Sequence, residues 1–314
     1  MLIPKGRGAL SDVVFELMRT SARSFAPALR TLADNDEDLH ITLWALYELH
    51  YRGFDDVSDD LEWHPELIEL RGSLENTFEQ ALRDRWQEHA PAGDLTEAMF
   101  EFVADHDGPS LASFIHREAD KEQALELLRM RSIYHLKESD PTTWVIPRLP
   151  DTTKAALMEL QFDEYGCGDP NRLHAGLFAR GMNSSGLRAE YGAYIDDVPL
   201  EVLEQNNAMS LFGLHRRLRG AALGHLAAFE ITSSIPSRKM AQGLGRLGLP
   251  AEMVAYYTEH VEADAVHEQL AVRTICGSLI DEEPALRDDV FFGVFSCLDL
   301  EDRFADRMLA EWTA

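Results

Sequence analysis

Apolar residues recur along most of this chain at the three- and four-residue spacing of amphipathic helices. The first such stripe consists of Leu10, Val13, Val14, Leu17 and Met18. Comparable patterns predict further helices at about 39–51, 65–90, 94–106, 111–138, 152–165, 197–203, 207–232, 236–246, 250–277 and 283–312. No stretch of useful length alternates apolar and polar residues as a strand would. The pattern therefore predicts an all-α protein.

Proline and glycine indicate where these helices end. The segment SDPTTWVIPRLPD, residues 139–151, carries three prolines and must interrupt the helix before it, because proline lacks a backbone N–H. Glycines at 166 and 168 interrupt the chain again, and we expect Asp169 to cap the next helix and Pro170 to open it. The weakest boundary lies near 90–110, so we expect an N-terminal helical region at 1–105 and a second domain at 106–314. The apolar stripes near the N-terminus suggest that the first region forms a homodimer.

Composition and charge limit the classes of partner. The 314 residues include 29 Lys and Arg against 55 Asp and Glu, a formal charge of −26. This charge repels nucleic acid and anionic lipid and mildly favours a cationic or zwitterionic substrate, although a solvated acidic surface is the more common explanation. Three cysteines without a CxxC pair fit a reducing compartment. With no apolar run near the ~20 residues of a membrane span and no signal-peptide pattern, we expect a cytoplasmic protein.

Candidate metal ligands are most concentrated in the segment HVEADAVHEQL, residues 260–270. His260, Asp264 and His267 are spaced i, i+4 and i+7, which places them within roughly 60° of one another on a helix. Two imidazoles and one carboxylate form a mixed nitrogen and oxygen site suited to iron. An exposed acidic helix is the alternative reading of the same segment.

Four other positions carry weaker signals. Glu164 and His174 flank the glycine-rich break, which lets the end of one helix and the start of the next bend around a common centre. Glu138 ends a helix, whereas Glu230 lies on an apolar helix, where a lone carboxylate is costly unless it is paired or coordinated. His225, five residues before Glu230, is either a group behind the ligands or simply a packed core histidine.

The segments that carry these residues resemble one known family. HLKESDPTTWVIPRL, LQFDEYGCGDPNRLHAGLF, SLFGLHRRLRGAALGHLAAFEITSS and HVEADAVHEQLA are similar to segments of the haem-oxygenase-like diiron oxidases and oxygenases, also described as iron-containing redox enzymes. The likeness covers about 130–275 and is greatest to the diiron domains of N-nitrosourea-forming enzymes. It implies a haem-oxygenase-like helical bundle at 106–314 with extra N-terminal helices. The ligands it implies for two non-haem iron ions are Glu138, Glu164, His174, Glu230, His260, Asp264 and His267.

The sequence departs from that family pattern in two places, and the resemblance leaves more than one activity possible. We expect no cupin-like module like that of those enzymes, and Asn171 stands where some relatives have a further carboxylate. The resemblance implies that two Fe(II) ions bind O2 as a peroxo-diiron(III) species, with an external electron donor, and we expect oxygenation of a primary amine or guanidine nitrogen in an amino-acid-like substrate. The alternatives are a diiron oxidase that cleaves C–C or C–H bonds of an amino acid or fatty acid, and a non-catalytic iron or haem carrier. A haem site would need an axial histidine in an apolar pocket.

Overall fold

Helix is the only regular secondary structure among the residues described by this computed structural model, which are 1–87 and 89–314, with the backbone alone for 262–266. In chain order the α-helices are α1 (Ala9–Arg19), α2 (Asp36–Glu48), α3 (Pro65–Arg85), α4 (Leu95–Ala104), α5 (Leu111–Arg117), α6 (Lys121–His135), α7 (Asp140–Thr143), α8 (Asp151–Glu164), α9 (His174–Ser184), α10 (Leu200–Leu214), α11 (Arg219–Arg246), α12 (Ala251–Gln269), α13 (Gly277–Glu282) and α14 (Arg287–Trp312). A π-helical turn, Leu270–Cys276, joins α12 to α13. The predicted all-α class is confirmed.

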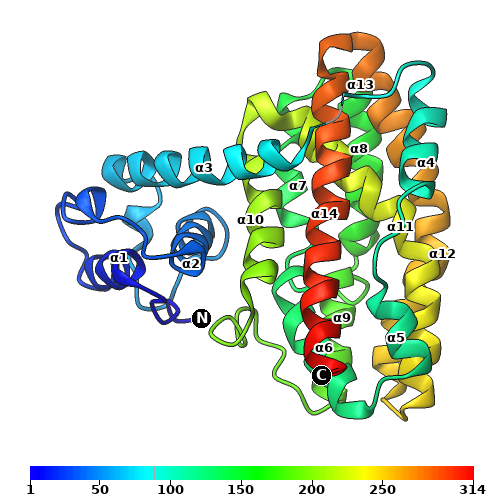
Figure 1. Cartoon of the computed structure of the whole chain (residues 1–314), viewed down its shortest axis with the longest axis horizontal. Helices are drawn as coiled ribbons and strands as arrows, with labels where there is room; N and C mark the ends of the chain where they lie inside the picture. The colour runs from blue at the N-terminus through cyan, green and yellow to red at the C-terminus, as the bar shows by residue number, and fades with distance from the viewer. Residues whose placement is uncertain (88) are drawn as a thin grey trace.

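The long helices run side by side in one bundle, while α1, α2 and the start of α3 lie to one side of it beyond α10 (Figure 1). Helix α11 packs against both α12 and α14. Its contact with α14 is close because glycine stands where the backbones meet: a Cβ on Gly224 would lie 1.9 Å from the carbonyl oxygen of Val290, and one on Gly293 would lie 2.0 Å from that of Ala221. This contact fixes α11, which carries Glu230, in the centre of the bundle.

The prediction of one helix over 111–138 is wrong, because α5 ends at Arg117 and α6 begins at Lys121. Asp120 is the N-cap of α6: its side chain accepts a hydrogen bond from the backbone N–H of Gln123 at 2.9 Å, and the Gln123 side chain accepts one from the N–H of Asp120 at 2.9 Å. This reciprocal cap stabilises a new helix start inside a segment whose residues all favour helix.

The break after α8 also differs from the prediction. Asp169 does not cap the following helix, which begins at His174 with Leu173 as its N-cap. Instead, Asp169 accepts a hydrogen bond from the backbone N–H of Asn171 at 2.9 Å and forms a local turn. Cys167 adopts a left-handed φ of 55° in the same loop. The loop therefore places Glu164 and His174 at two facing helix ends.

Two further predicted helix ends are wrong. The gap expected near 204–206 lies inside α10, and the chain breaks at His215–Leu218 instead. Helix α11 continues through Pro236 to Arg246 although proline lacks the donor for a helical hydrogen bond. Packing of α11 against its two neighbours holds the helix together across that position.

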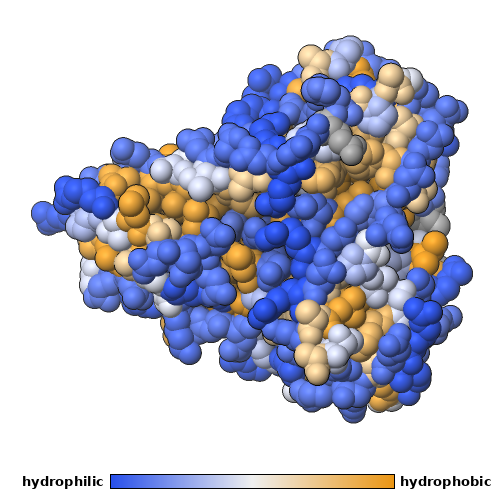
Figure 2. All heavy atoms as spheres, viewed as in Figure 1, coloured by the Kyte–Doolittle hydropathy of each residue, from blue (hydrophilic) through white to orange (hydrophobic). Residues whose placement is uncertain are grey.

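Hydrophilic residues cover most of the face shown in Figure 2, with smaller hydrophobic areas between them. Among the described residues, no helix combines the length and apolar content needed to cross a membrane. The division at 105/106 stays a prediction.

Candidate metal centre

Six of the seven predicted ligands lie in two groups of three. In each group, one nitrogen or carboxylate oxygen per residue lies within 4.8 Å of the others. The first group is Glu138, His174 and His260, and the second is Glu164, Glu230 and His267. They come from the turn after α6 and from α8, α9, α11 and α12. The seventh predicted ligand, Asp264, has a side chain outside the described residues, and metal binding by the seven stays a prediction.

Glu164 connects the two groups. Its Oε2 lies 3.0 Å from Nδ1 of His174, in the first group, and its Oε1 lies 3.7 Å from Nδ1 of His267, in the second. Oε2 of Glu230 lies 3.6 Å from the same nitrogen of His267. A carboxylate with one oxygen directed at each group has the arrangement of a ligand that bridges two metal ions.

The nitrogen and oxygen atoms of the two groups are arranged for metal coordination better than for hydrogen bonds with one another. Nδ1 of His174 and Nδ1 of His267 are buried, and neither forms a hydrogen bond within the described part of the chain, although carboxylate oxygens lie within 4 Å of both. The oxygen near His174 is close enough but not aligned for a hydrogen bond, and those near His267, at 3.7 and 3.6 Å, are too far away. Imidazole nitrogens and carboxylate oxygens that converge in this way form a donor set suited to iron.

Residues behind the candidate ligands orient the imidazoles. Nδ1 of His260 lies 2.8 Å from the carbonyl oxygen of Tyr256, so this nitrogen carries the hydrogen and Nε2 is left to bind a metal. Nε2 of His267 lies 3.1 Å from Oδ2 of Asp163, which leaves Nδ1 as the ligand atom. Neither Asp163 nor Tyr256 was predicted in these roles, because no local pattern in the sequence singles out either residue.

Electrostatics at the site favour bound positive charge. Burial would raise the pKa of Glu138, but the imidazoles of His135 and His260, which lie 3.6 and 3.5 Å from its oxygens, outweigh burial and hold that pKa below its usual range. Burial would lower the pKa of His267, yet the carboxylates of Glu230 and Glu164 raise it to about 9. The lowered pKa of Glu138 and the raised pKa of His267 both show that this site favours a bound positive charge.

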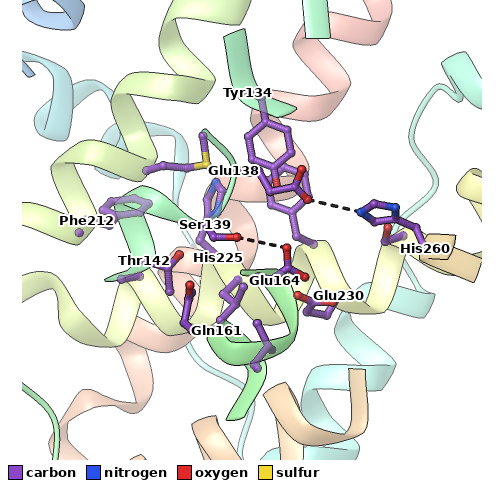
Figure 3. A pocket seen from close by; sticks show the side chains of 17 residues that line it. Tyr134, Glu138, Ser139, Thr142, Gln161, Glu164, Phe212, His225, Glu230 and His260 are labelled. Carbon is purple, nitrogen blue, oxygen red and sulfur yellow. Dashed lines mark hydrogen bonds and ion pairs between the residues drawn. The ribbon is translucent and has the colours of Figure 1, made fainter. Parts of the chain in front are cut away.

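Two cavities meet at this site. The smaller, which we call the inner cavity, has a volume of about 60 Å³ and is lined by Glu138, Glu164, Glu230 and His260 together with His225 and apolar side chains. Figure 3 shows the three carboxylates near its centre, with His225 and His260 on different sides. The larger, which we call the outer chamber, has a volume of about 320 Å³. Both are lined by Tyr134, Glu138, Phe229, Ser233 and His260.

Comparisons with known proteins indicate the family and the fold of this chain. Residues 125–302, more than half of the chain, match the family described as iron-containing redox enzyme. A search of curated proteins finds no match. Among solved structures, a CADD-like protein of unknown function from Nostoc punctiforme PCC 73102 is similar in fold, with a TM-score of 0.50 and 16% identity over 76% of this chain and 99% of that one.

Proposed function

We propose that this protein is a non-haem diiron oxygenase that oxygenates a primary amine or guanidine nitrogen of an amino-acid-like substrate. The proposal starts from its family: the chain belongs to the iron-containing redox enzymes and is therefore an oxidoreductase. The position of Glu164 between the two groups of candidate ligands is the observation that carries the proposal. A haem carrier is harder to reconcile with three carboxylates and three imidazoles gathered around one centre.

Two Fe(II) ions, when bound, would supply electrons and open coordination positions for O2. The protein's part is to hold the ligands in fixed directions and keep water away. Asp163 and the carbonyl of Tyr256 fix the rings of His267 and His260. Phe212, Leu226 and other apolar side chains line the inner cavity beside the carboxylates and limit its water content.

The outer chamber is the proposed substrate site, because Glu138 and His260 lie at its junction with the inner cavity. Its volume of about 320 Å³ is in the range of small-molecule sites. Carboxylates outnumber cationic side chains on its lining. Arg131 is held by Glu301 through two hydrogen bonds of 2.6 Å, while Asp302 lies 2.9 Å from the imidazole of His106. A chamber with this excess of negative charge favours an amine-bearing substrate.

The apolar part of the same chamber supports the second candidate function. Leu127, Met240 and Leu298 line it and would accommodate an alkyl chain. A diiron oxidase that cleaves C–C or C–H bonds of an amino acid or fatty acid would use that surface.

The proposed reaction also needs a reductant. Inserting one oxygen atom of O2 into an N–H bond converts the amine to a hydroxylamine and reduces the other oxygen atom to water. This balance takes up two electrons and two protons beyond those of the substrate. An external electron donor is therefore part of the proposal.

Anaerobic loading with Fe(II) tests the proposal. We expect two irons per chain, a transient visible absorbance after O2 is mixed in a stopped-flow instrument, and products heavier by one oxygen atom when amines are supplied. His267→Ala should lose the transient, whereas His89→Ala, at an exposed histidine, should retain it. One iron or none in the wild-type protein would refute the diiron assignment, and products of C–C cleavage would favour the second candidate.

A further inference from the structure

His225 differs from the other buried histidines in its contacts. Its side chain belongs to α11, the residue is only 6% exposed, and its ring packs against Phe212 and Phe229 with centroid distances of 5.9 and 5.2 Å. The other buried histidines each have a hydrogen-bond or ion-pair partner; these are His40, His50, His174, His260 and His267. Within the described residues, His225 forms neither a hydrogen bond nor an ion pair.

The ring nitrogens of His225 are not among the fully buried atoms that lack a hydrogen-bond partner, because the ring borders the inner cavity. Burial lowers the pKa of His225 to about 4, so the ring is neutral near pH 7. A neutral imidazole has one N–H donor and one nitrogen acceptor. The ring also lines the inner cavity, where Figure 3 shows it beside the carboxylates of the candidate metal centre. Its hydrogen-bonding capacity is thus available to a molecule inside that cavity.

The size and lining of the inner cavity restrict what that molecule is. A volume of about 60 Å³ accommodates a few water molecules or one small ligand, but not an amino acid. Two other polar groups of the lining are already engaged: Ser139 donates a hydrogen bond to Oε2 of Glu164 at 3.1 Å, and Oε1 of Gln161 accepts one from Thr143 at 3.3 Å. Phe212 and Leu226 supply an apolar wall, which suits O2.

We propose that His225 is a binding residue of the inner cavity, where its neutral imidazole donates a hydrogen bond to an O2-sized ligand held at the metal pair. The larger substrate then occupies the outer chamber, on the far side of the stacked rings of Tyr134 and Phe229, whose centroids are 5.0 Å apart. This inference rests on the proposed diiron function, because the metal pair holds the ligand.

Azide is a suitable probe because it is small, accepts hydrogen bonds and binds ferric iron. Its affinity is measured by titrating the charge-transfer absorbance of the oxidised, iron-loaded protein, and iron is counted separately in each variant. His225→Phe removes the donor but keeps a flat ring among aromatic neighbours, so we expect two irons per chain and azide binding about tenfold weaker. His225→Gln restores an N–H donor and should recover most of the affinity. His40→Gln, at a buried histidine outside both cavities, should bind azide as the wild type does.

A second variant tests the cavity without altering the histidine. Ala222 lines the inner cavity but not the outer chamber, and Ala222→Leu would fill a space of about 60 Å³. We expect this variant to keep two irons and lose azide binding. If the wild type holds fewer than two irons, the proposed function fails and this inference fails with it. If two irons are present and neither His225→Phe nor Ala222→Leu weakens azide binding, only the assignment of His225 and the inner cavity is overturned. Loss of iron in His225→Phe would also overturn it, since the residue would then support the metal ligands instead.

Discussion

Replacing Glu48 by glutamine is expected to destabilise the protein by several kcal/mol. Glu48 forms an ion pair with Lys137, and the exposed fractions of the two side chains are 0% and 1%. The hydroxyl of Tyr191 donates a hydrogen bond to Oε1 of Glu48 at 2.7 Å, and Nζ of Lys137 lies 4.2 Å from the centre of the Tyr51 ring. In Glu48→Gln, the ammonium of Lys137 stays buried without a counter-ion.

Two independent arguments give the size of this loss. Removing one partner of a buried ion pair costs about 3–5 kcal/mol of the free energy of unfolding. The variant can also release the proton of Lys137 when it folds. At pH 7 that release costs about 4.6 kcal/mol, because the usual pKa of lysine is ~10.4 and each pH unit corresponds to ~1.36 kcal/mol. Since the cheaper route prevails, the loss should not exceed about 5 kcal/mol.

The second route also predicts how the loss depends on pH. In Glu48→Gln, the unfolded chain would bind one proton at Lys137 that the folded chain does not. Stability therefore rises with pH wherever the unfolded state holds more protons, by about 1.36 kcal/mol per unit from pH 7 up to about pH 10. The variant should regain close to 3 kcal/mol relative to the wild type between pH 7 and pH 9.

Urea unfolding followed by circular dichroism at pH 7 and pH 9 measures both quantities. The double variant Glu48→Gln/Lys137→Met should be more stable than either single variant, because no unpaired charge remains buried. Glu311→Gln breaks an ion pair with Arg307 in which both side chains are about half exposed, and it should change stability by less than about 0.5 kcal/mol. A loss below about 1 kcal/mol in Glu48→Gln, or a double variant no better than the worse single one, would refute the reasoning.

Three further predictions concern the metal centre and the core. Glu164→Gln should reduce the iron content below two per chain, measured after anaerobic loading and desalting. The control Glu159→Gln, at an exposed residue of the same helix, should keep both irons. Equal iron content in the two variants would contradict the bridging role of Glu164. Asp163→Ala removes the acceptor behind His267 and should weaken iron binding by about 10–100-fold in a chelator competition, so a change below twofold would count against that role. Burial lowers the pKa of His40 to about 3, so the ring is neutral in the folded protein above that pH. In the unfolded chain the same ring becomes protonated below about pH 6.5. The unfolded state therefore gains stability relative to the folded state as the pH falls below about 6.5. His40→Gln should therefore remove about 3 kcal/mol of the stability difference between pH 7 and pH 4 in urea unfolding, and an unchanged difference would exclude His40 as its source.

Much of the fold could be predicted from the sequence because helical periodicity is a local property. The all-α class is confirmed, and the family match and the similar solved structure confirm the haem-oxygenase-like bundle. The errors lie at helix ends. Asp120 and Gln123 form a cap that interrupts a segment of strong helix formers, whereas Asp169 sits before a proline and yet makes a turn. Both choices depend on which backbone N–H each side chain reaches, and composition alone does not decide this.

The sequence predicted which side chains gather at the candidate site, but not the residues around them. Residue chemistry and the family resemblance together selected Glu164 and five other side chains that the structure brings into two groups. Asp163 and His267 are 104 positions apart, and Lys137 and Glu48 are 89 apart. Contacts over such separations depend on how whole helices pack, so no spacing rule in the sequence predicts them.

Contacts behind the metal centre give the N-terminal helices a role beyond the dimer contact predicted for them. Arg52, just after α2, donates a hydrogen bond of 2.8 Å to the carbonyl oxygen of Leu136 and lies 3.7 Å from Asp140, so it holds both sides of the turn that carries Glu138. Asp140 in turn accepts a hydrogen bond of 2.9 Å from Tyr165, the residue after Glu164. Region 1–105 thus supports two candidate ligands from behind. Arg52→Ala should consequently weaken iron binding in a chelator competition whether the protein is a monomer or a dimer in solution, and unchanged iron affinity would limit this region to other roles.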